Sequence, residues 1–178
     1  RTGLPVSLSS EDRELLQRPV ELNIWRAPTD NDRHVRLEWE RAHYHQAVAR
    51  AYGVEVDEEP GRVTVSADVG LVAPSVQPAL HGRLLWSLTD DGVLSLGMRR
   101  TLGFPSLPRL GLRLFLPESM SQVDYYGLGP QESYVDKRRA SHHGAFSADV
   151  VDLHEDYIRP QENGSHADCN KVLLSGGG

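Results

Sequence analysis

Alternation of apolar and polar side chains is the feature that most constrains how this chain can fold. Over residues 63–69, valine or alanine alternates with threonine, serine or aspartate. Because a strand turns successive side chains to opposite faces, this period of two predicts a strand with one buried face. Further strands are predicted from apolar runs at residues 84–88, 93–98, 109–116, 122–126, 149–153 and 171–174.

Short turns separate most of these runs. Thr89–Gly92 ends in Asp-Gly, which supplies the positive φ angles of a tight hairpin turn. The acidic stretch from Glu55 to Gly61 closes with Pro-Gly and is predicted to be a surface turn. Strands joined by brief turns predict an all-β fold, an antiparallel β-sandwich that forms a single domain over residues 1–178.

One segment departs from this pattern. From about Val35 to Ala49, apolar residues lie among charged ones at roughly helical spacing, which predicts a short amphipathic helix that covers an edge or end of the sheet. The chain ends in a Ser-Gly-Gly-Gly loop just after a predicted strand, so we expect it to be cut inside a larger domain. Uncovered strand faces and open edges would then promote self-association.

Charge and cysteine content exclude several classes of protein. The net charge of −6 disfavours a nucleic-acid partner, and we interpret the basic cluster Lys137–Arg139 as a solvated turn. The single cysteine, Cys169, excludes an internal disulfide and a cysteine-rich metal site, and it is interpreted as a small, partly buried apolar residue. No apolar run approaches the ~20 residues of a membrane span, and no signal peptide opens the chain, which together predict a cytoplasmic protein with no membrane partner.

Three short segments contain more polar and aromatic residues than the alternation explains. The first, residues 23–32, combines Trp25 and Arg26 with two carboxylates that flank an amide, namely Asp30, Asn31 and Asp32. An arginine near carboxylates suits a bidentate ion pair, and oxygen ligands of this kind also suit a sugar hydroxyl or a cation. A satisfied turn that locks two strands or docks a neighbouring domain is the simpler interpretation, and no metal site is assigned.

The second segment, residues 125–134, places tyrosines beside a glycine-rich bend. Its residues of interest are Tyr126, Gly127, Gly129, Gln131, Glu132 and Tyr134. Tyr126 and Gln131 are possible sugar contacts, because an aromatic face can carry a sugar ring and an amide can bind hydroxyls. The alternative is a strand that ends in a tight turn, with its tyrosines packed at the edge of the sandwich.

The third segment, residues 157–166, contains Glu162, Asn163 and Gly164. Asn-Gly is a hairpin-type turn signal. Glu132 and Glu162 are the natural pair to test for glycosidase chemistry, since glycosidases use two carboxylates at a defined separation. The eight histidines, including the pairs His43/His45 and His142/His143, are predicted to be solvated surface residues.

Taken together, the three segments resemble three signatures of the C-terminal (small-chain) domain of family-2 β-galactosidases. They occur in the same order, and the resemblance extends from about residue 10 to about residue 175. It implies a β-sandwich of the galactose mutarotase-like type and an accessory, non-catalytic domain of an enzyme that cleaves terminal β-D-galactosides such as lactose. The signature residues named in the three segments then act as structural or inter-domain elements, and the chain alone is expected to be inactive.

The same resemblance implies where the chemistry and the partners lie. In that family the catalytic glutamates belong to a separate barrel, and the Mg and Na ions are bound by other domains, so no cofactor is expected in this chain. The expected partners are the remaining β-galactosidase domains, a carbohydrate through the parent enzyme, and further copies in a homo-oligomer. An independent carbohydrate-binding or mutarotase-like module remains the alternative.

Overall fold

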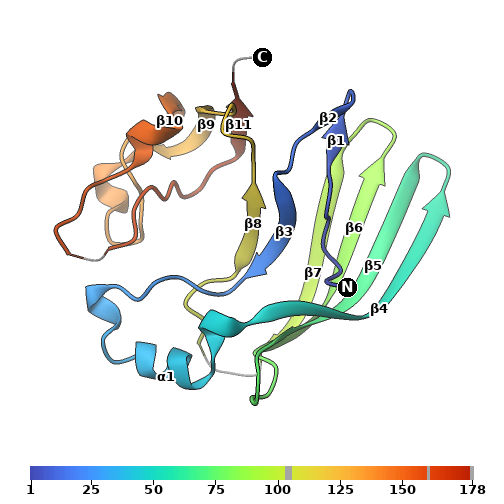
Figure 1. The fold of residues 1–178 in the computed structure, drawn as a ribbon. Coiled ribbons are helices and arrows are strands. Elements are labelled where there is room, and N and C mark those ends of the chain that lie inside the picture. Colours follow the sequence, from blue (N-terminus) through green and yellow to red (C-terminus); the bar gives the residue numbers. More distant parts are fainter. Residues whose placement is uncertain (103–105, 160, 177–178) are drawn as a thin grey trace. The chain divides into compact units, whose positions relative to one another are not determined.

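A computed structural model describes residues 1–102, 106–159 and 161–176 (Figure 1). The chain divides into two compact units. The first comprises Arg1–Ala27 and Asp32–Phe115, and the second comprises Pro28–Asn31 and Leu116–Gly178.

The first unit is built around a four-stranded antiparallel sheet in the order β4-β5-β6-β7. Its strands are β4 (Val48–Glu59), β5 (Arg62–Val72), β6 (Leu80–Thr89) and β7 (Leu94–Leu102). The antiparallel pair β3 (Arg18–Asn23) and β8 (Gly111–Phe115) forms a second sheet, and β1 (Ser9–Ser10) pairs with β2 (Arg13–Glu14). Helix α1 (Arg36–Arg41) and a 3-10 turn at Tyr44–Gln46 lie between β3 and β4 in the sequence.

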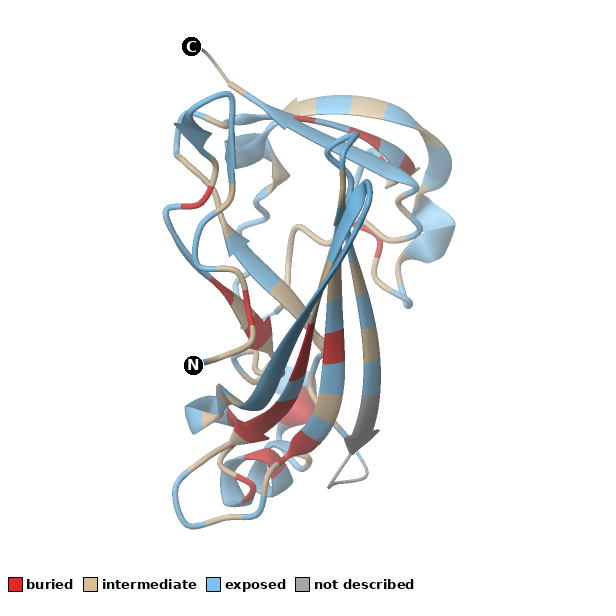
Figure 2. Ribbon diagram, turned by 90° about the vertical axis from the view of Figure 1, so that its right-hand side faces the viewer, coloured by how far each residue is buried: buried red, intermediate tan, exposed pale blue. Residues whose placement is uncertain are grey.

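The core of the first unit lies between these two sheets. Leu71, Leu80 and Leu84 of the large sheet are fully buried, as is Ile24 just after β3. Side chains from both layers, including Val20 of β3 and Trp86 of β6, line a small cavity of about 50 Å³. The buried positions run along one part of the sheet in Figure 2, as expected for strands with a single covered face.

The second unit contains a three-stranded antiparallel sheet in the order β10-β9-β11. Its strands are β9 (Gln122–Gly129), β10 (His142–Asp149) and β11 (Lys171–Ser175), with 3-10 turns at Arg138–Ala140 and Val150–Leu153. Val123 and Tyr125 of the central strand β9 are buried.

The all-β prediction is confirmed, because antiparallel sheets dominate both units and helix is scarce. The mutarotase-like type and the single-domain assignment stay predictions. Most strands appear where alternation places them, and the turn from Thr89 to Gly92 closes the β6–β7 hairpin. Only Gly92 of its Asp-Gly pair adopts a positive φ, of 80°.

One local prediction is confirmed with shorter bounds, and two are wrong. A short helix is present within the range predicted from Val35 to Ala49, but it spans only α1, because His43 adopts a left-handed φ of 56° and the chain is extended from Ala47 onward. The predicted acidic turn is largely the end of β4, an edge strand whose exposed faces accommodate charge, and only Pro60 and Gly61 form the turn. Of the strand predicted at residues 149–153, only Asp149 is in a strand, as the last residue of β10, and Val150–Leu153 form a 3-10 turn.

In the part of the chain that the structure describes, no helix is both long enough and apolar enough to cross a membrane.

Candidate functional site

Gly127 and Gly129 of the second segment lie within β9, where close packing leaves no room for a side chain. A Cβ atom at Gly127 would lie 2.6 Å from the Cys169 Sγ and 3.0 Å from the Cys169 Cα. One at Gly129 would lie 2.9 Å from the Phe146 ring and closer still to the Tyr125 hydroxyl. These glycines therefore let neighbouring segments approach the central strand closely.

Glu132, just after β9, is the buried centre of a polar cluster. Its side chain is only 6% exposed and accepts hydrogen bonds from the Lys137 ammonium and the Tyr157 hydroxyl. The backbone N–H of Gly164 donates to the Glu132 Oε2 at 3.1 Å. Lys137 also lies 4.5 Å from the centre of the Tyr157 ring. One carboxylate thus joins the second predicted segment to the third. Pairing with a cation and several hydrogen bonds are what stabilise a buried charge of this kind.

The third segment folds as a loop held from both sides, and the predicted hairpin turn is wrong. Gly164 has the expected positive φ, of 72°, but no paired strands flank it among the described residues. Asn163 donates its side-chain amide to the Glu155 carbonyl at 3.1 Å, while Gly164 reaches Glu132. Asn-Gly therefore shapes a loop around the carboxylate.

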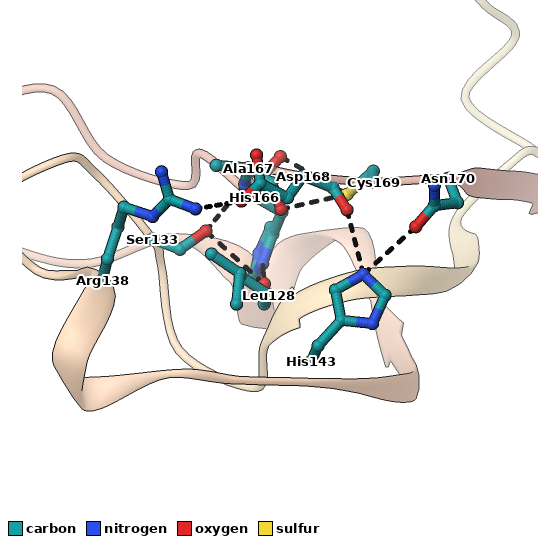
Figure 3. Close-up of polar contacts among 9 residues, drawn as sticks. All are labelled: Leu128, Ser133, Arg138, His143, His166, Ala167, Asp168, Cys169 and Asn170. Carbon is teal, nitrogen blue, oxygen red and sulfur yellow. Dashed lines mark hydrogen bonds and ion pairs between the residues drawn. The ribbon is translucent and has the colours of Figure 1, made fainter.

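Residues 165–170 then run beside β9 and are tied to it (Figure 3). The Leu128 N–H donates to the Ala167 carbonyl at 3.1 Å, and the Ala167 N–H donates to the buried Ser133 Oγ at 2.7 Å. The Ser133 N–H in turn donates to the Ser165 carbonyl at 2.7 Å. These bonds explain why the strand end and the loop form one compact element.

Histidines also belong to this element. The His166 Nδ1 lies 3.3 Å from the Leu128 carbonyl, and its ring centre is 4.5 Å from that of Tyr125. His143 is exposed, as predicted, and its Nε2 lies 3.1 Å from the Asn170 Oδ1 and 3.2 Å from the Asp168 carbonyl. Of the other paired histidines, His45 and His142 are exposed, whereas His43 is half-buried. The surface prediction therefore fails for His43 and for His166, which is also half-buried.

Cys169 is half-buried, and its thiol lies 3.4 Å from the His166 carbonyl. Burial, aided by the Asp168 carboxylate, raises the pKa of the Cys169 thiol. Because the thiolate is the reactive form, we expect an aromatic disulfide reagent to react at least about tenfold more slowly with folded protein at pH 8 than with urea-unfolded protein. Absorbance of the released thiolate measures both rates, and the pH midpoint of the folded rate should lie above that of the unfolded chain. Equal rates would contradict the expectation.

The first segment splits between two sets of ion pairs. Arg26 forms a bidentate ion pair with Asp32, in which the Arg26 Nη2 donates to the Asp32 Oδ1 at 3.0 Å. The Arg26 guanidinium also lies 5.3 Å from the centre of the buried Trp39 ring. Asp30, in the second unit, pairs with Arg159 of the third segment at 3.2 Å. The predicted bidentate arginine pair is therefore present.

Trp25 and Asn31 have different surroundings. Trp25 is half-buried, its backbone N–H donates to the Asn23 Oδ1 at 3.2 Å, and its ring centre lies 5.6 Å from that of His45. Asn31 is exposed. Both positions fit a turn that positions Arg26 and Asp30.

A metal ion does not fit these carboxylates. Asp30 and Asp32 each face an arginine, and Glu132 faces a lysine. Across residues 1–102, 106–159 and 161–176, no three His, Cys, Asp or Glu side chains are grouped to hold an ion.

An open pocket of about 530 Å³ lies beside Glu132 in the second unit. The residues that line it are Gln131, Glu132, Asp136, Lys137, Arg139, Ala140, Glu155 and Tyr157. Among the two predicted sugar contacts, Gln131 lines this pocket, whereas Tyr126 of β9 packs edge-on against His143 with ring centres 4.5 Å apart. Glu162 is half-buried and is not among the described lining residues, so the structure does not bring Glu132 and Glu162 together in this pocket.

Sequence reasoning missed Lys137, Ser133 and Tyr157 as partners in this site. The turn predicted at Lys137–Arg139 is present, but Lys137 pairs with Glu132 and Arg138 pairs with Asp168. Tyr134 also contacts Lys137, whose ammonium lies 5.8 Å from the Tyr134 ring centre. An acidic residue five positions before a lysine was the available signal, and it identifies a pair only once the bend between them is known.

Comparisons with known proteins place this geometry in a family context. The model of the β-galactosidase small chain matches residues 1–178. The chain is 37% identical over 169 residues to a β-galactosidase of Actinobacillus pleuropneumoniae, which covers 94% of this chain and 17% of that protein. It is 38% identical over 157 residues to a β-galactosidase of Staphylococcus xylosus (87% of this chain, 16% of the relative). A third relative, a β-galactosidase of Lactobacillus delbrueckii subsp. bulgaricus, is 34% identical and covers 93% of this chain. The chain therefore spans about a sixth of the length of these relatives.

Proposed function

Because the chain belongs to the β-galactosidase small-chain family, we propose that it is an accessory, non-catalytic part of a hydrolase of terminal β-D-galactosides such as lactose. In this role it supports closure of the active-site pocket and assembly of the enzyme. Its partners are the remaining domains of the polypeptide and further copies of the enzyme. The Mg and Na ions and the catalytic carboxylates belong to those other domains.

The bonding of Glu132 is the observation that carries the proposal. A glycosidase acid or nucleophile must reach the anomeric centre of a bound sugar. The Glu132 carboxylate is instead buried and accepts bonds from Lys137, Tyr157 and Gly164. These bonds support a role for Glu132 as a structural cross-link.

An exposed apolar strand supports assembly with other domains. Every residue of β11 is exposed, and Val172, Leu173 and Leu174 are 54%, 51% and 38% exposed. Apolar surface grouped in this way is typical of contact with another protein surface.

The proposal predicts that the purified 178-residue chain does not turn over a chromogenic β-galactoside, whereas the longer polypeptide that contains it does. Absorbance of the released chromophore measures both. Turnover by the purified chain would contradict the proposal.

Exchange of Glu132 or Glu162 for glutamine in the longer polypeptide provides the matched comparison. If either glutamate were catalytic, its exchange would lower kcat of the folded enzyme by about a thousandfold or more. If both glutamates are accessory, the exchange lowers kcat per folded molecule by less than about tenfold, which is below the roughly 10²–10⁴-fold contribution of a general acid or base. Circular dichroism of each variant corrects for the folded fraction.

A further inference from the structure

The pocket beside Glu132 contains two distinct sets of polar side chains. Glu132, Lys137 and Tyr157 are bonded to one another and form an internally satisfied group. The others, Gln131, Asp136, Arg139 and Glu155, have exposed side chains that line the same pocket. Within the described part of the chain, no residue forms a side-chain hydrogen bond or ion pair with these four. They are therefore free to bond a ligand.

The four free side chains differ in hydrogen-bonding character. The Gln131 amide both donates and accepts, the Arg139 guanidinium only donates, and the Asp136 and Glu155 carboxylates only accept. Sugar hydroxyls also both donate and accept, so a polyhydroxylated ring can satisfy such a mixed set without carrying charge.

The charge of the pocket disfavours ionic ligands. Lys137 and Arg139 are balanced against Glu132, Asp136 and Glu155. A phosphate or carboxylate ligand would meet the two free carboxylates. A metal ion would meet the two cations, and the described carboxylates do not form a group that could hold one.

Size and an aromatic surface complete the fit. The volume of about 530 Å³ lies within the range of small-molecule sites, about 300–1,000 Å³. Tyr157 is 40% exposed and offers ring surface to the pocket, while its hydroxyl is held by Glu132. An aromatic ring with a fixed orientation suits the apolar face of a sugar.

We propose that this pocket is a binding site for a neutral sugar, formed by Gln131, Asp136, Arg139 and Glu155 around the Tyr157 ring. The site is non-catalytic and is carried by the second unit of this chain. The selection of a galactose-type sugar rests on the proposed function, whereas the neutral, polyhydroxylated character of the ligand rests on the pocket itself.

The test is a titration of the 15N-labelled 178-residue protein with D-galactose, followed by amide chemical shifts. We expect saturable shifts around residues 131–139 and 155–159, with a Kd on the order of 1–10 mM. The double substitution Gln131→Ala/Glu155→Ala should weaken binding by at least about fivefold, since it removes two hydrogen-bonding side chains. Glu118→Ala, an exposed carboxylate of the same unit outside the pocket, is the matched control and should retain the Kd.

Lactose, inorganic phosphate and calcium serve as comparison ligands. Saturable binding of galactose or lactose that the double substitution weakens supports the proposal. Absence of saturable sugar shifts up to 100 mM (about tenfold above the expected Kd range) would overturn it. So would sugar binding that the double substitution leaves unchanged, or tighter binding of phosphate or calcium at this pocket. Hydrolysis by the longer polypeptide is measured separately, so a negative titration leaves the accessory role standing.

Discussion

Replacing Glu132 with alanine is expected to destabilise the second unit by about 2–4 kcal/mol, because three donors lose a shared acceptor. The Glu132 side chain is 6% exposed, and within the described part of the chain the Gly164 N–H donates only to Glu132. Lys137 is 38% exposed and can turn to solvent, which keeps the loss below that of a fully buried pair.

The measurement must report on the second unit. All three tryptophans lie in the first unit, so tryptophan fluorescence follows that unit. Hydrogen exchange at the Gly164, Leu128 and Ser133 amides follows the second unit, and these amides should exchange faster in the alanine variant. Glu155→Ala, an exposed neighbour, should change stability by less than about 0.5 kcal/mol. Unchanged protection of Gly164 in Glu132→Ala would contradict the structural role of Glu132.

Replacing Gly127 with alanine is the second large effect, an expected loss of about 2–3 kcal/mol from overpacking. The new methyl group would lie 2.6 Å from the Cys169 Sγ, 3.0 Å from the Cys169 Cα and 3.3 Å from the Ala167 carbonyl oxygen. Relief requires a backbone shift of residues 167–169, which are bonded to Leu128 and Ser133.

Two further substitutions isolate this steric cause. Cys169→Ala removes the sulfur contact, so it should recover about 1 kcal/mol of the loss in the double variant and leave the backbone contact. Gly111→Ala is the control, since no heavy atom lies within 4 Å of its added Cβ, and it should cost nothing. Urea unfolding followed by far-UV circular dichroism and hydrogen exchange measures all three. A Gly127→Ala variant as stable as the parent would show that the loop is not packed against β9 as described.

Two of the errors in predicted secondary structure concern β4 and the segment just before it. Charged residues at the end of β4 suggested a turn, and apolar spacing before it suggested a longer helix. The position of β4 at the edge of the sheet explains the first error, because an edge strand tolerates exposed charge on either face. The second error has a local origin, since the left-handed φ of His43 ends the helical region before Ala47. Edge position is a property of the assembled sheet, and local spacing does not encode it.

The candidate site was predictable as segments but not as a site. All three segments were identified by their unexplained polar and aromatic residues, and the pairing of Arg26 with Asp32 was anticipated. Glu132 and Glu162 were candidates of equal standing in the sequence. Only folding distinguishes them, by burying Glu132 between Lys137, Tyr157 and Gly164, the last of which is 32 positions away.

The sequence by itself determined the β class of this protein, most of its strands and the position of the β6–β7 turn, because side-chain alternation and turn chemistry act between near neighbours. The tertiary structure alone decided which polar groups are bonded and which remain free. Glu132 and Glu155 are both glutamates on loops, yet one is buried in a cluster and the other lines an open pocket. The physical reason is that burial and hydrogen-bond satisfaction depend on segments that meet only when the chain folds.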